Sequence, residues 1–176
     1  MANREALREL QTRLASRLQA ARSEGVSASW LAVKAGESNY LFPLSHAGEI
    51  FPLTQIQLVP YARPWFMGVV NLRGALYGVV DLASFMGDRL SRVRGEQSLA
   101  ESSVITFNGA LELNCALLVD GLAGLRKRDA FSAAVAPPAG SPAYFGNRFT
   151  DLNGIEWQEL NLQSLSQLSE FLNISA

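Results

Sequence analysis

The sequence is poor in the residues on which many enzymes and extracellular scaffolds depend. It contains one cysteine, Cys115, and one histidine, His46, among 176 residues. A single cysteine excludes an internal disulfide and a cysteine-based zinc site. Cys115 lies in the apolar segment LNCALLVD, which predicts a small buried core residue.

The sequence also lacks a large excess of positive or negative charge, and it lacks long apolar runs. The 15 Lys and Arg and the 16 Asp and Glu give a net charge of −1, which disfavours a protein built mainly to bind nucleic-acid phosphates. Two basic clusters, 89–94 and 126–128, lack interleaved aromatics, so we interpret them as solvated loop ends rather than an RNA-binding surface. No apolar run approaches the roughly 20 residues that span a bilayer, and no signal-peptide core is seen. We expect a cytoplasmic protein with no nucleic-acid partner and no direct membrane insertion.

Catalytic signatures are not found in the sequence either. His46 lies in PLSHAGEI, where a surface or turn position is expected and nothing supports a role as a general base. No G-x-S-x-G elbow, P-loop or G-x-G-x-x-G follows a predicted strand, and no His/Asp/Glu cluster has metal-ligand spacing. We therefore expect no catalytic residue, no metal and no cofactor, which favours a binding module over an enzyme.

An amphipathic helix is predicted over residues 3–24, with Gly25 ending its pattern. Apolar residues recur at spacings of three and four and so share one face: they are Leu7, Leu10, Leu14, Leu18 and Ala21. Three interpretations remain open, namely a helix that packs on its own domain, a partner-binding or self-associating helix, and a membrane-surface helix. Glutamates and a small apolar face argue against the last.

The rest of the chain has the pattern of a β protein. Short apolar segments alternate with Gly, Pro, Asn and Asp, which is typical of a sandwich or a small barrel. The predicted strands are 30–35, 39–44, 47–52, 67–72, 75–81, 102–107, 113–119 and 155–160. We also predict short helices within 81–90 and 160–173, an exposed loop over 88–98, and a linker or edge-covering loop over 134–147, where three prolines prevent a strand ladder.

The segment WFMGVVNLRGALYGVVDL, residues 65–82, places Asn71, Arg73 and Gly74 between two apolar runs. A buried arginine needs a partner, and the nearest upstream acid is Glu49, 24 residues earlier in a predicted strand. The intervening loop allows the two strands to lie side by side, so we predict a Glu49–Arg73 ion pair. The pair is costly to break if it is partly buried, and contributes little if it lies on the surface.

The same segment resembles the central signature of the CheW-like coupling domains. That signature is Gly-x-x-Asn-Leu-Arg-Gly, then a strand ending in Asp-Leu and a short helix ending in Gly. The matching residues are Pro64, Gly68, Asn71, Leu72, Arg73, Gly74, Asp81, Leu82 and Gly87. Upstream FPLSHAGEI, with Glu49 at the family's spacing from Arg73, and downstream ALLVDGLAGL, with Asp120, extend the resemblance over roughly residues 30–168.

The resemblance implies a mainly β fold of two packed, small, five-stranded, SH3-like β-barrels over residues 30–172. An amphipathic helix, 1–25, precedes them and a short helix follows. The resemblance also implies a function, that of a non-catalytic signalling adaptor. Such an adaptor joins the cytoplasmic tip of a chemoreceptor, a methyl-accepting protein, to the regulatory domain of a CheA-type histidine kinase in a two-component system. Such adaptors are recruited to membrane receptor arrays. The N-terminal extension resembles that of the pilus-associated, PilI-type branch, which serves twitching motility through type IV pili.

The resemblance also implies roles for single residues. The partner-binding set, in a groove between the barrels, is Ala47, Glu49, Gly68, Asn71, Arg73 and Gly74, and Asp81 and Asp120 are structural. Gly68 and Gly74 are expected to allow a tight turn with a close backbone approach, and Asn71 to satisfy backbone groups in that turn. The sequence departs from the family pattern at Ala47, Gly78 and Asn161, where a larger aliphatic residue, a proline and an aspartate are common.

A function of another class also stays open, a small-ligand-binding or enzymatic β-barrel with its site in a groove between two lobes. Such a site needs polar residues that converge in a pocket. One histidine and 16 scattered carboxylates do not assemble one from the sequence alone.

Overall fold

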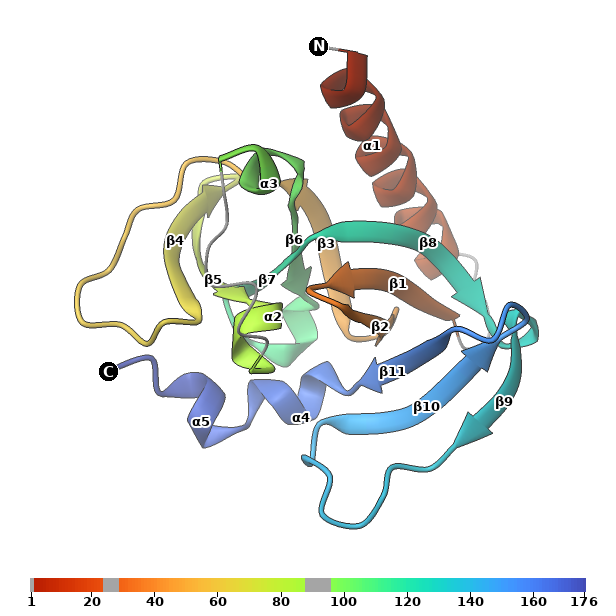
Figure 1. Ribbon diagram of the computed structural model, residues 1–176. Helices are drawn as coiled ribbons and strands as arrows, with labels where there is room; N and C mark the ends of the chain where they lie inside the picture. The colour runs from red at the N-terminus through yellow and green to blue at the C-terminus, as the bar shows by residue number, and fades with distance from the viewer. Residues whose placement is uncertain (1, 24–28, 88–95) are drawn as a thin grey trace.

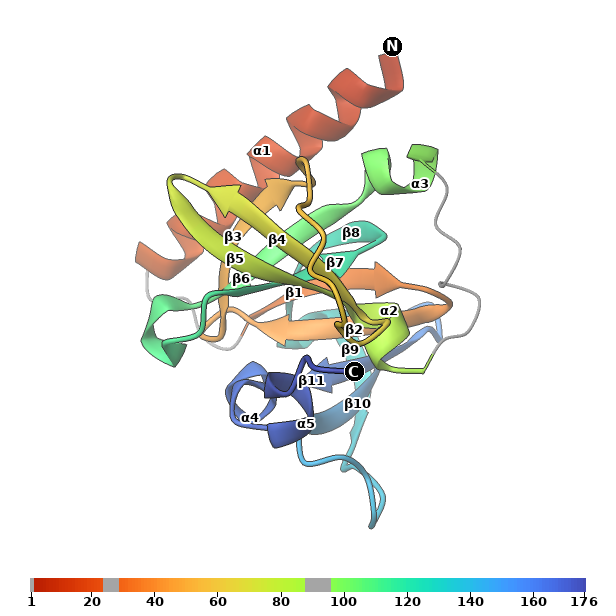
Figure 2. The ribbon, with the colours of Figure 1, turned by 90° about the vertical axis from the view of Figure 1, so that its left-hand side faces the viewer.

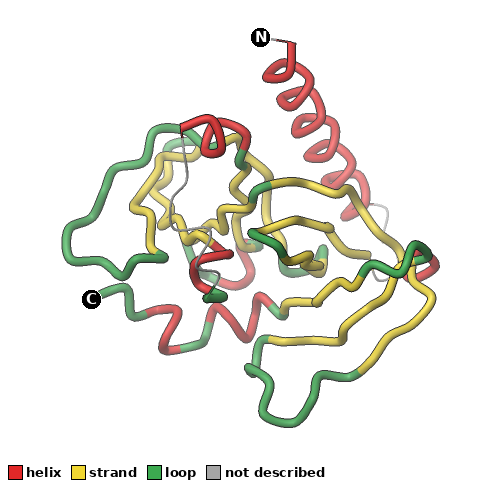
Figure 3. The backbone as a smooth tube through the Cα atoms, viewed as in Figure 1, coloured by secondary structure: helices red, strands yellow, loops and turns green. Residues whose placement is uncertain are grey.

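The computed structural model of the chain describes residues 2–23, 29–87 and 96–176. Two β-sheets pack against each other, a long helix stands on one side of them, and short helices lie near the C-terminus (Figure 1). The helices are α1 (Ala2–Ser23), α2 (Leu82–Phe85), α3 (Glu96–Glu101), α4 (Leu162–Ser166) and α5 (Ser169–Leu172). Figure 3 shows that the described chain between α1 and α4 consists mainly of strands and the loops that join them. This is the mainly β, two-sheet fold that the sequence predicts.

One sheet has six strands in the order β8-β1-β2-β11-β10-β9. Their bounds are β1 (Ser29–Ala35), β2 (Ser38–Pro43), β8 (Gly121–Lys127), β9 (Phe131–Val135), β10 (Phe145–Asp151) and β11 (Glu156–Leu160). All neighbours are antiparallel except β2 and β11. The strands of this sheet contribute an aromatic-rich buried cluster, which consists of Trp30, Ala32, Leu41, Phe149 and Trp157.

The other sheet has five strands in the order β3-β6-β7-β5-β4. They are β3 (Ala47–Pro52), β4 (Phe66–Leu72), β5 (Ala75–Asp81), β6 (Ser103–Phe107) and β7 (Cys115–Val119). Successive side chains point to opposite faces of a strand, so Val104 and Leu118 pack within this sheet, whereas Ile105 and Leu117 join a larger cluster shared with the first sheet. β6 and β7 are thus buried on both faces, which explains their unbroken apolar sequences.

The segment that follows β3 reaches the opposite end of the five-stranded sheet. β3 and β4 stand at opposite ends of the strand order, but the segment after β3 crosses to β4, where Gln57 and Val69 exchange two backbone hydrogen bonds of 2.8 and 2.9 Å. Gly68, at φ +132°, sits beside this bridge, and a Cβ there would overlap the carbonyl oxygen of Gln57. The expected close approach at Gly68 is therefore confirmed, and it lets the crossing segment pair with β4.

The eight predicted strands are all present, each within two residues of its predicted ends. Three further strands, β8, β9 and β10, are missing from the prediction, and all three belong to the first sheet. That sheet has six strands, where the resemblance implied five. β8 has the sequence GLAGLRK and pairs with β1, so partner strands rather than its own glycine-rich sequence fix its conformation. The predicted loop over 134–147 is wrong at both ends, which belong to β9 and β10.

The short helices are shorter than predicted. Of the described residues 81–87, only Leu82–Phe85 form a helix, α2, and 160–173 forms α4 and α5 in place of one helix. Asn161 caps α4, since its side chain accepts a hydrogen bond from the Ser164 amide at 3.0 Å. The predicted loop over 88–98 ends within α3, and residues 88–95 lie outside the described part of the chain.

The N-terminal helix packs on its own domain along its second half. Leu14 and Leu18 are buried, and the side-chain amide of Gln11 donates a hydrogen bond of 2.6 Å to the Ser103 hydroxyl. Leu10 is 41% exposed, so the apolar stripe continues beyond the contact. Of the described helices, none has the length and apolar character needed to cross a membrane.

Asp151 organises the β10–β11 hairpin, a role that the sequence did not indicate. Its carboxylate accepts hydrogen bonds from the Trp157 ring nitrogen at 3.0 Å and from the amides of Asn153 and Ile155 at 2.8 and 3.0 Å. The hydrogen bond from Trp157, followed by those from the two amides, holds the pKa of the carboxyl below its usual 3.8.

Gly68→Ala should lower the free energy of unfolding by about 3 kcal/mol, because backbone strain adds to overlap with Gln57. Gly74→Ala is the matched control, since Gly74 also has a positive φ but no atom lies within 4 Å of the place that a Cβ would take; about 1 kcal/mol is expected there. Urea unfolding measures both losses. Equal losses would show that closure at Gly68 does not constrain the sheet.

Asp151→Asn should destabilise the protein at neutral pH and have less effect in acid. The folded-state pKa is lowered, so the carboxylate's contribution is present above the unfolded value of 3.8 and is lost as pH falls through the folded value. Urea midpoints of both proteins, measured from pH 7 down to about pH 2.5, should therefore converge. A gap that is constant over this range would contradict the charged role of Asp151.

Candidate functional site

The Asn-Leu-Arg-Gly segment forms the two-residue turn of the β4–β5 hairpin. Leu72 faces Ala75 across the hairpin, and the two residues between them, Arg73 and Gly74, have φ values of +50° and +84°. Positive φ at both central residues is the pattern of a type I′ turn, which matches the twist of the flanking strands. The Asn71 side-chain oxygen accepts a hydrogen bond of 2.9 Å from the Gly74 amide, so the expected roles of Asn71 and Gly74 in the turn are confirmed.

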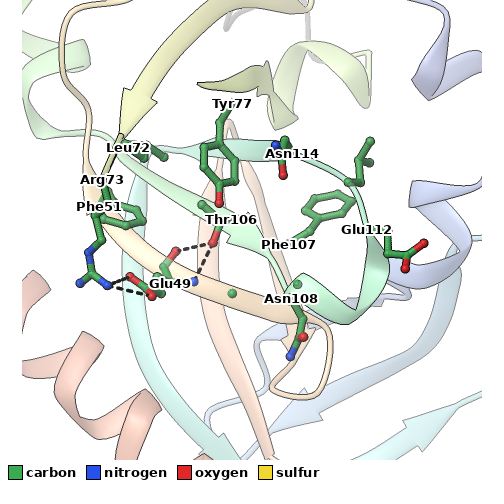
Figure 4. A pocket seen from close by; sticks show the side chains of 13 residues that line it. Glu49, Phe51, Leu72, Arg73, Tyr77, Thr106, Phe107, Asn108, Glu112 and Asn114 are labelled. Atoms are coloured by element: carbon green, nitrogen blue, oxygen red, sulfur yellow. Dashed lines mark hydrogen bonds and ion pairs between the residues drawn. The ribbon is translucent and has the colours of Figure 1, made fainter. Parts of the chain in front are cut away.

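Arg73 and Glu49 form the predicted ion pair. One guanidinium nitrogen of Arg73 lies 2.8 and 3.0 Å from the two carboxylate oxygens of Glu49, and the guanidinium carbon lies 5.5 Å from the centre of the Phe51 ring (Figure 4). The side chains are 73% and 39% exposed, respectively. The pair therefore lies on the surface, the second of the two cases considered from the sequence. Since exposed pairs contribute about 0–1 kcal/mol to stability, this pair is not a main source of stability.

A bulge in β3 positions Glu49. The pairing of β3 with β6 shifts register between Ala47 and Ile50, and the Glu49 amide donates a hydrogen bond of 2.7 Å to the Thr106 hydroxyl. Bulges re-aim side chains at the edges of sheets. Gly48 makes room for this contact, because a Cβ at that position would overlap the Thr106 hydroxyl and lie 2.7 Å from the Phe107 carbonyl oxygen.

A pocket of about 290 Å³ lies beside the ion pair (Figure 4). Its wall comes from β3, the end of β4 with the turn that follows, β5, β6 and the segment that joins β6 to β7. Figure 2 views this sheet from the side of the β4–β5 hairpin. Side chains with polar groups on the wall are Glu49, Arg73, Tyr77, Thr106, Asn108, Glu112 and Asn114. The pocket offers hydrogen-bond donors, acceptors and a neutralised charge pair, and no histidine or cysteine is among its lining residues.

Metal and acid–base chemistry gain no support from the described residues. Across 2–23, 29–87 and 96–176, no group of three or more His, Cys, Asp and Glu side chains could hold a metal ion. His46 lies in the turn before β3, as expected, and burial lowers the pKa of its ring. Burial raises the pKa of the Cys115 thiol to about 12, as fits the core position predicted for that residue.

The remaining predicted site residues fall into different environments. Ala47 is fully buried, so it presents no surface to a partner in this conformation. Asp81 is buried at the start of α2 and accepts a hydrogen bond of 3.2 Å from the Ser84 hydroxyl. Asp120 accepts one from the amide of Gly36. Both aspartates thus accept hydrogen bonds from elsewhere in the fold, whereas the side chains of Glu49 and Arg73 are 39% and 73% exposed.

Two arginines of the basic cluster 126–128 pack against aromatic rings. The guanidinium groups of Arg126 and Arg128 each lie 5.6 Å from the centre of an aromatic ring, Trp157 and Phe149 respectively. Arg126 and Lys127 belong to β8, so the interpretation of this cluster as loop ends is wrong for these two residues. Arg89, Arg92 and Arg94 lie outside the described residues.

The contributors to the site that were missed from the sequence include Phe51, Tyr77 and Thr106. Each lies in a strand that was predicted, and each faces the pocket. The signal available was the alternation of side chains along β3, β5 and β6, but it identifies a face only after the order of the strands is known.

A double-mutant cycle on Glu49→Ala and Arg73→Ala should give a coupling free energy of about 0.5–1 kcal/mol, as expected for an exposed pair. Neither change should abolish folding, because both side chains lie outside the buried clusters. Urea unfolding of the four proteins measures the coupling. Additive losses would show that the two side chains do not interact in solution.

Comparisons with known proteins agree with this geometry. A profile of the CheW-like domain matches residues 29–168. The chain is 28% identical over 127 residues to Protein PilI of Pseudomonas aeruginosa, a match that covers 71% of this chain and 68% of that protein. The fold is similar to that of the scaffolding protein TtCheW from Thermoanaerobacter tengcongensis, with a TM-score of 0.59, 17% identity, and coverage of 77% of this chain and 89% of that one.

The profile and the solved structure test the resemblance that the Asn-Leu-Arg-Gly segment suggested, and they confirm it. The similarity to PilI agrees with the pilus-associated branch that the N-terminal extension suggested. The matched span contains both strands of the turn, Glu49 and the two sheets. The chain therefore belongs to the CheW-like domain family.

Proposed function

We propose that the chain is a non-catalytic adaptor that couples a chemoreceptor to a CheA-type histidine kinase, at cytoplasmic receptor arrays that control type IV pilus twitching motility or chemotaxis. The observation that carries this proposal is the state of Arg73. Its backbone has a left-handed φ of +50°, unfavourable for arginine, and its side chain is held by Glu49 while 73% exposed.

The energetics of this residue favour recognition over stability. An asparagine at Arg73 would suit the turn better, and the exposed ion pair stabilises the fold little. Fixed charges on a rigid hairpin instead give a binding surface its register and its selectivity. Membership in the CheW-like family and similarity to PilI support the assignment to a coupling adaptor of the pilus-associated branch.

A second surface suits the kinase. In the β3–β4 connection, Leu58 is 79% and Tyr61 is 91% exposed, and Tyr61 has a φ of +56°. The backbone here is held on one side by the Gln57–Val69 bridge and on the other by the C-terminal residues, where Ala62 bridges Ser175. A rigid loop that presents large apolar side chains is typical of a protein interface, and we assign this loop, 58–61, to the regulatory domain of the kinase.

The pocket beside Arg73 gives no support to an enzymatic function. Its volume of about 290 Å³ is at or below the usual range for small-molecule sites. Its described lining brings no nucleophile together with a base. This pocket therefore gives no specific support to the alternative of a ligand-binding or enzymatic barrel.

Two substitutions test the two surfaces in one binding experiment. Arg73→Asn removes the guanidinium and keeps a residue that tolerates positive φ, so the receptor-tip fragment should bind at least about tenfold more weakly. Tyr61→Asn removes an exposed aromatic ring, and asparagine again tolerates the positive φ at this position. The regulatory domain of the kinase should then bind about tenfold more weakly. Calorimetric titration of the full chain with each purified partner from the same organism measures both.

Arg148→Asn is the matched control. Arg148 is a half-exposed arginine 4.0 Å from Glu156 on the other sheet, so its loss should leave both affinities unchanged. Failure of the wild-type chain to bind either partner would contradict the adaptor function. Equal weakening by Arg73→Asn and Arg148→Asn would instead show that Arg73 has no particular role in binding.

A further inference from the structure

The segment that follows α5 pairs with the β3–β4 connection. Ala62 and Ser175 form an antiparallel bridge. On either side of this bridge, backbone hydrogen bonds of 2.8 and 2.9 Å join residues 61–63 to residues 174–176. Figure 1 shows the C-terminal end of the chain beside this connection. Residues 174–176 thus pair with the loop in the manner of a short antiparallel strand.

Tyr61 lies inside this paired stretch and has a left-handed φ of +56°. This conformation is unfavourable for a large side chain, and it persists only where neighbouring contacts fix the backbone. The carbonyl of Tyr61 accepts a hydrogen bond of 2.9 Å from the Ala176 amide. Two residues further on, the Arg63 amide donates one of 2.8 Å to the Ile174 carbonyl. Without these two bonds, the backbone at Tyr61 is free to leave the left-handed region.

A buried aromatic ring anchors the pairing segment in the core. Phe171 of α5 is only 3% exposed. Its ring stacks on that of Trp65, which ends the β3–β4 connection, with 6.2 Å between the ring centres. The rings of Phe85 and Phe107 pack against it with centres 5.3 and 5.9 Å away. Phe171 therefore fixes the point from which residues 174–176 reach the loop.

The pairing segment lies beyond the part of the chain that the family profile matches. That match ends at residue 168, but it includes the whole β3–β4 connection. The conformation of a loop inside the matched domain is therefore held by residues outside the match. This makes the segment a feature to test on this chain itself.

We propose that residues 171–176 are a clamp that holds Tyr61 in the conformation in which its exposed ring meets the regulatory domain of the kinase. The inference rests on the proposed adaptor function, which assigns loop 58–61 to that domain. The clamp acts through backbone hydrogen bonds and through Phe171, so kinase affinity depends on residues that lie outside the loop. Binding of the receptor tip, assigned to Arg73 on the β4–β5 turn, does not depend on the clamp.

Two changes weaken the clamp and leave every side chain of loop 58–61 in place. Removal of residues 174–176 takes away both backbone hydrogen bonds and should weaken binding of the kinase regulatory domain at least about fivefold, because the binding conformation is then only partly populated. Ala176→Pro removes only the amide that donates to Tyr61, and should weaken binding about twofold. Ser175 is already extended in its bridge, as a residue before proline prefers.

Ser175→Ala is the matched control, because it changes an exposed side chain of the same segment and leaves the backbone hydrogen bonds in place. Its affinity should equal that of the wild-type chain. Calorimetric titration with the kinase regulatory domain and with the receptor-tip fragment measures all four proteins. The affinity for the receptor tip should be the same in each.

Hydrogen exchange shows whether the clamp has been released locally. Without residues 174–176, the Arg63 amide should exchange at least about tenfold faster. The Val69 amide, which donates to the Gln57 carbonyl at the other end of the connection, should keep its rate. An unchanged rate at Arg63 would show that the segment does not hold the loop, and would overturn the proposal.

The binding data separate this inference from the function on which it rests. Unchanged kinase affinity in a chain whose Arg63 amide exchanges faster would overturn the clamp and leave the adaptor function standing. Equal losses for the kinase and the receptor tip would indicate a general loss of folding, and would also overturn the clamp. Additive losses on combining the truncation with Tyr61→Asn would show that the segment does not act through Tyr61. Failure of the wild-type chain to bind either partner would overturn the adaptor function as well.

Discussion

In the five-stranded sheet, the segment that follows the edge strand β3 crosses to the other edge strand, β4, and the site depends on this closure. The bridge between Gln57 and Val69 joins the edges through backbone hydrogen bonds, and Gly68 gives the crossing segment room to approach. Closure brings the β4–β5 turn over β3, where Arg73 meets Glu49. The pocket beside the pair is a consequence of the same closure, since strands from both ends of the sheet order line it.

The residues that stabilise this fold are not those of the Glu49–Arg73 pair. Three apolar clusters hold the two sheets together, and buried polar residues such as Asp81 and Asp151 fix local turns through hydrogen bonds. Arg73 contributes little to this, because its ion pair is exposed. A rigid scaffold can hold such a residue in a left-handed conformation, and residues of this kind concentrate where proteins bind partners.

Most strands of the fold could be predicted from the sequence, because the apolar patterns that indicate a strand lie within short segments. Alternating or continuous apolar segments predicted eight strands, including the fully buried β6 and β7. β8 and β9 were missed because GLAGLRK is glycine-rich and FSAAV is short, and both depend on pairing with stronger strands. β10 was missed because the preceding prolines and glycine suggested a longer loop than the one that forms.

The sequence by itself determined the turn at Asn71–Gly74 and the amphipathic character of the N-terminal helix, since each follows from residues close together in the chain. Only the tertiary structure decided what these elements meet. The Glu49–Arg73 distance depends on strand order and on a bulge in β3, and the burial of Ala47 depends on the core in which it lies. Long-range contacts of this kind arise from packing across many residues, and no short segment encodes them.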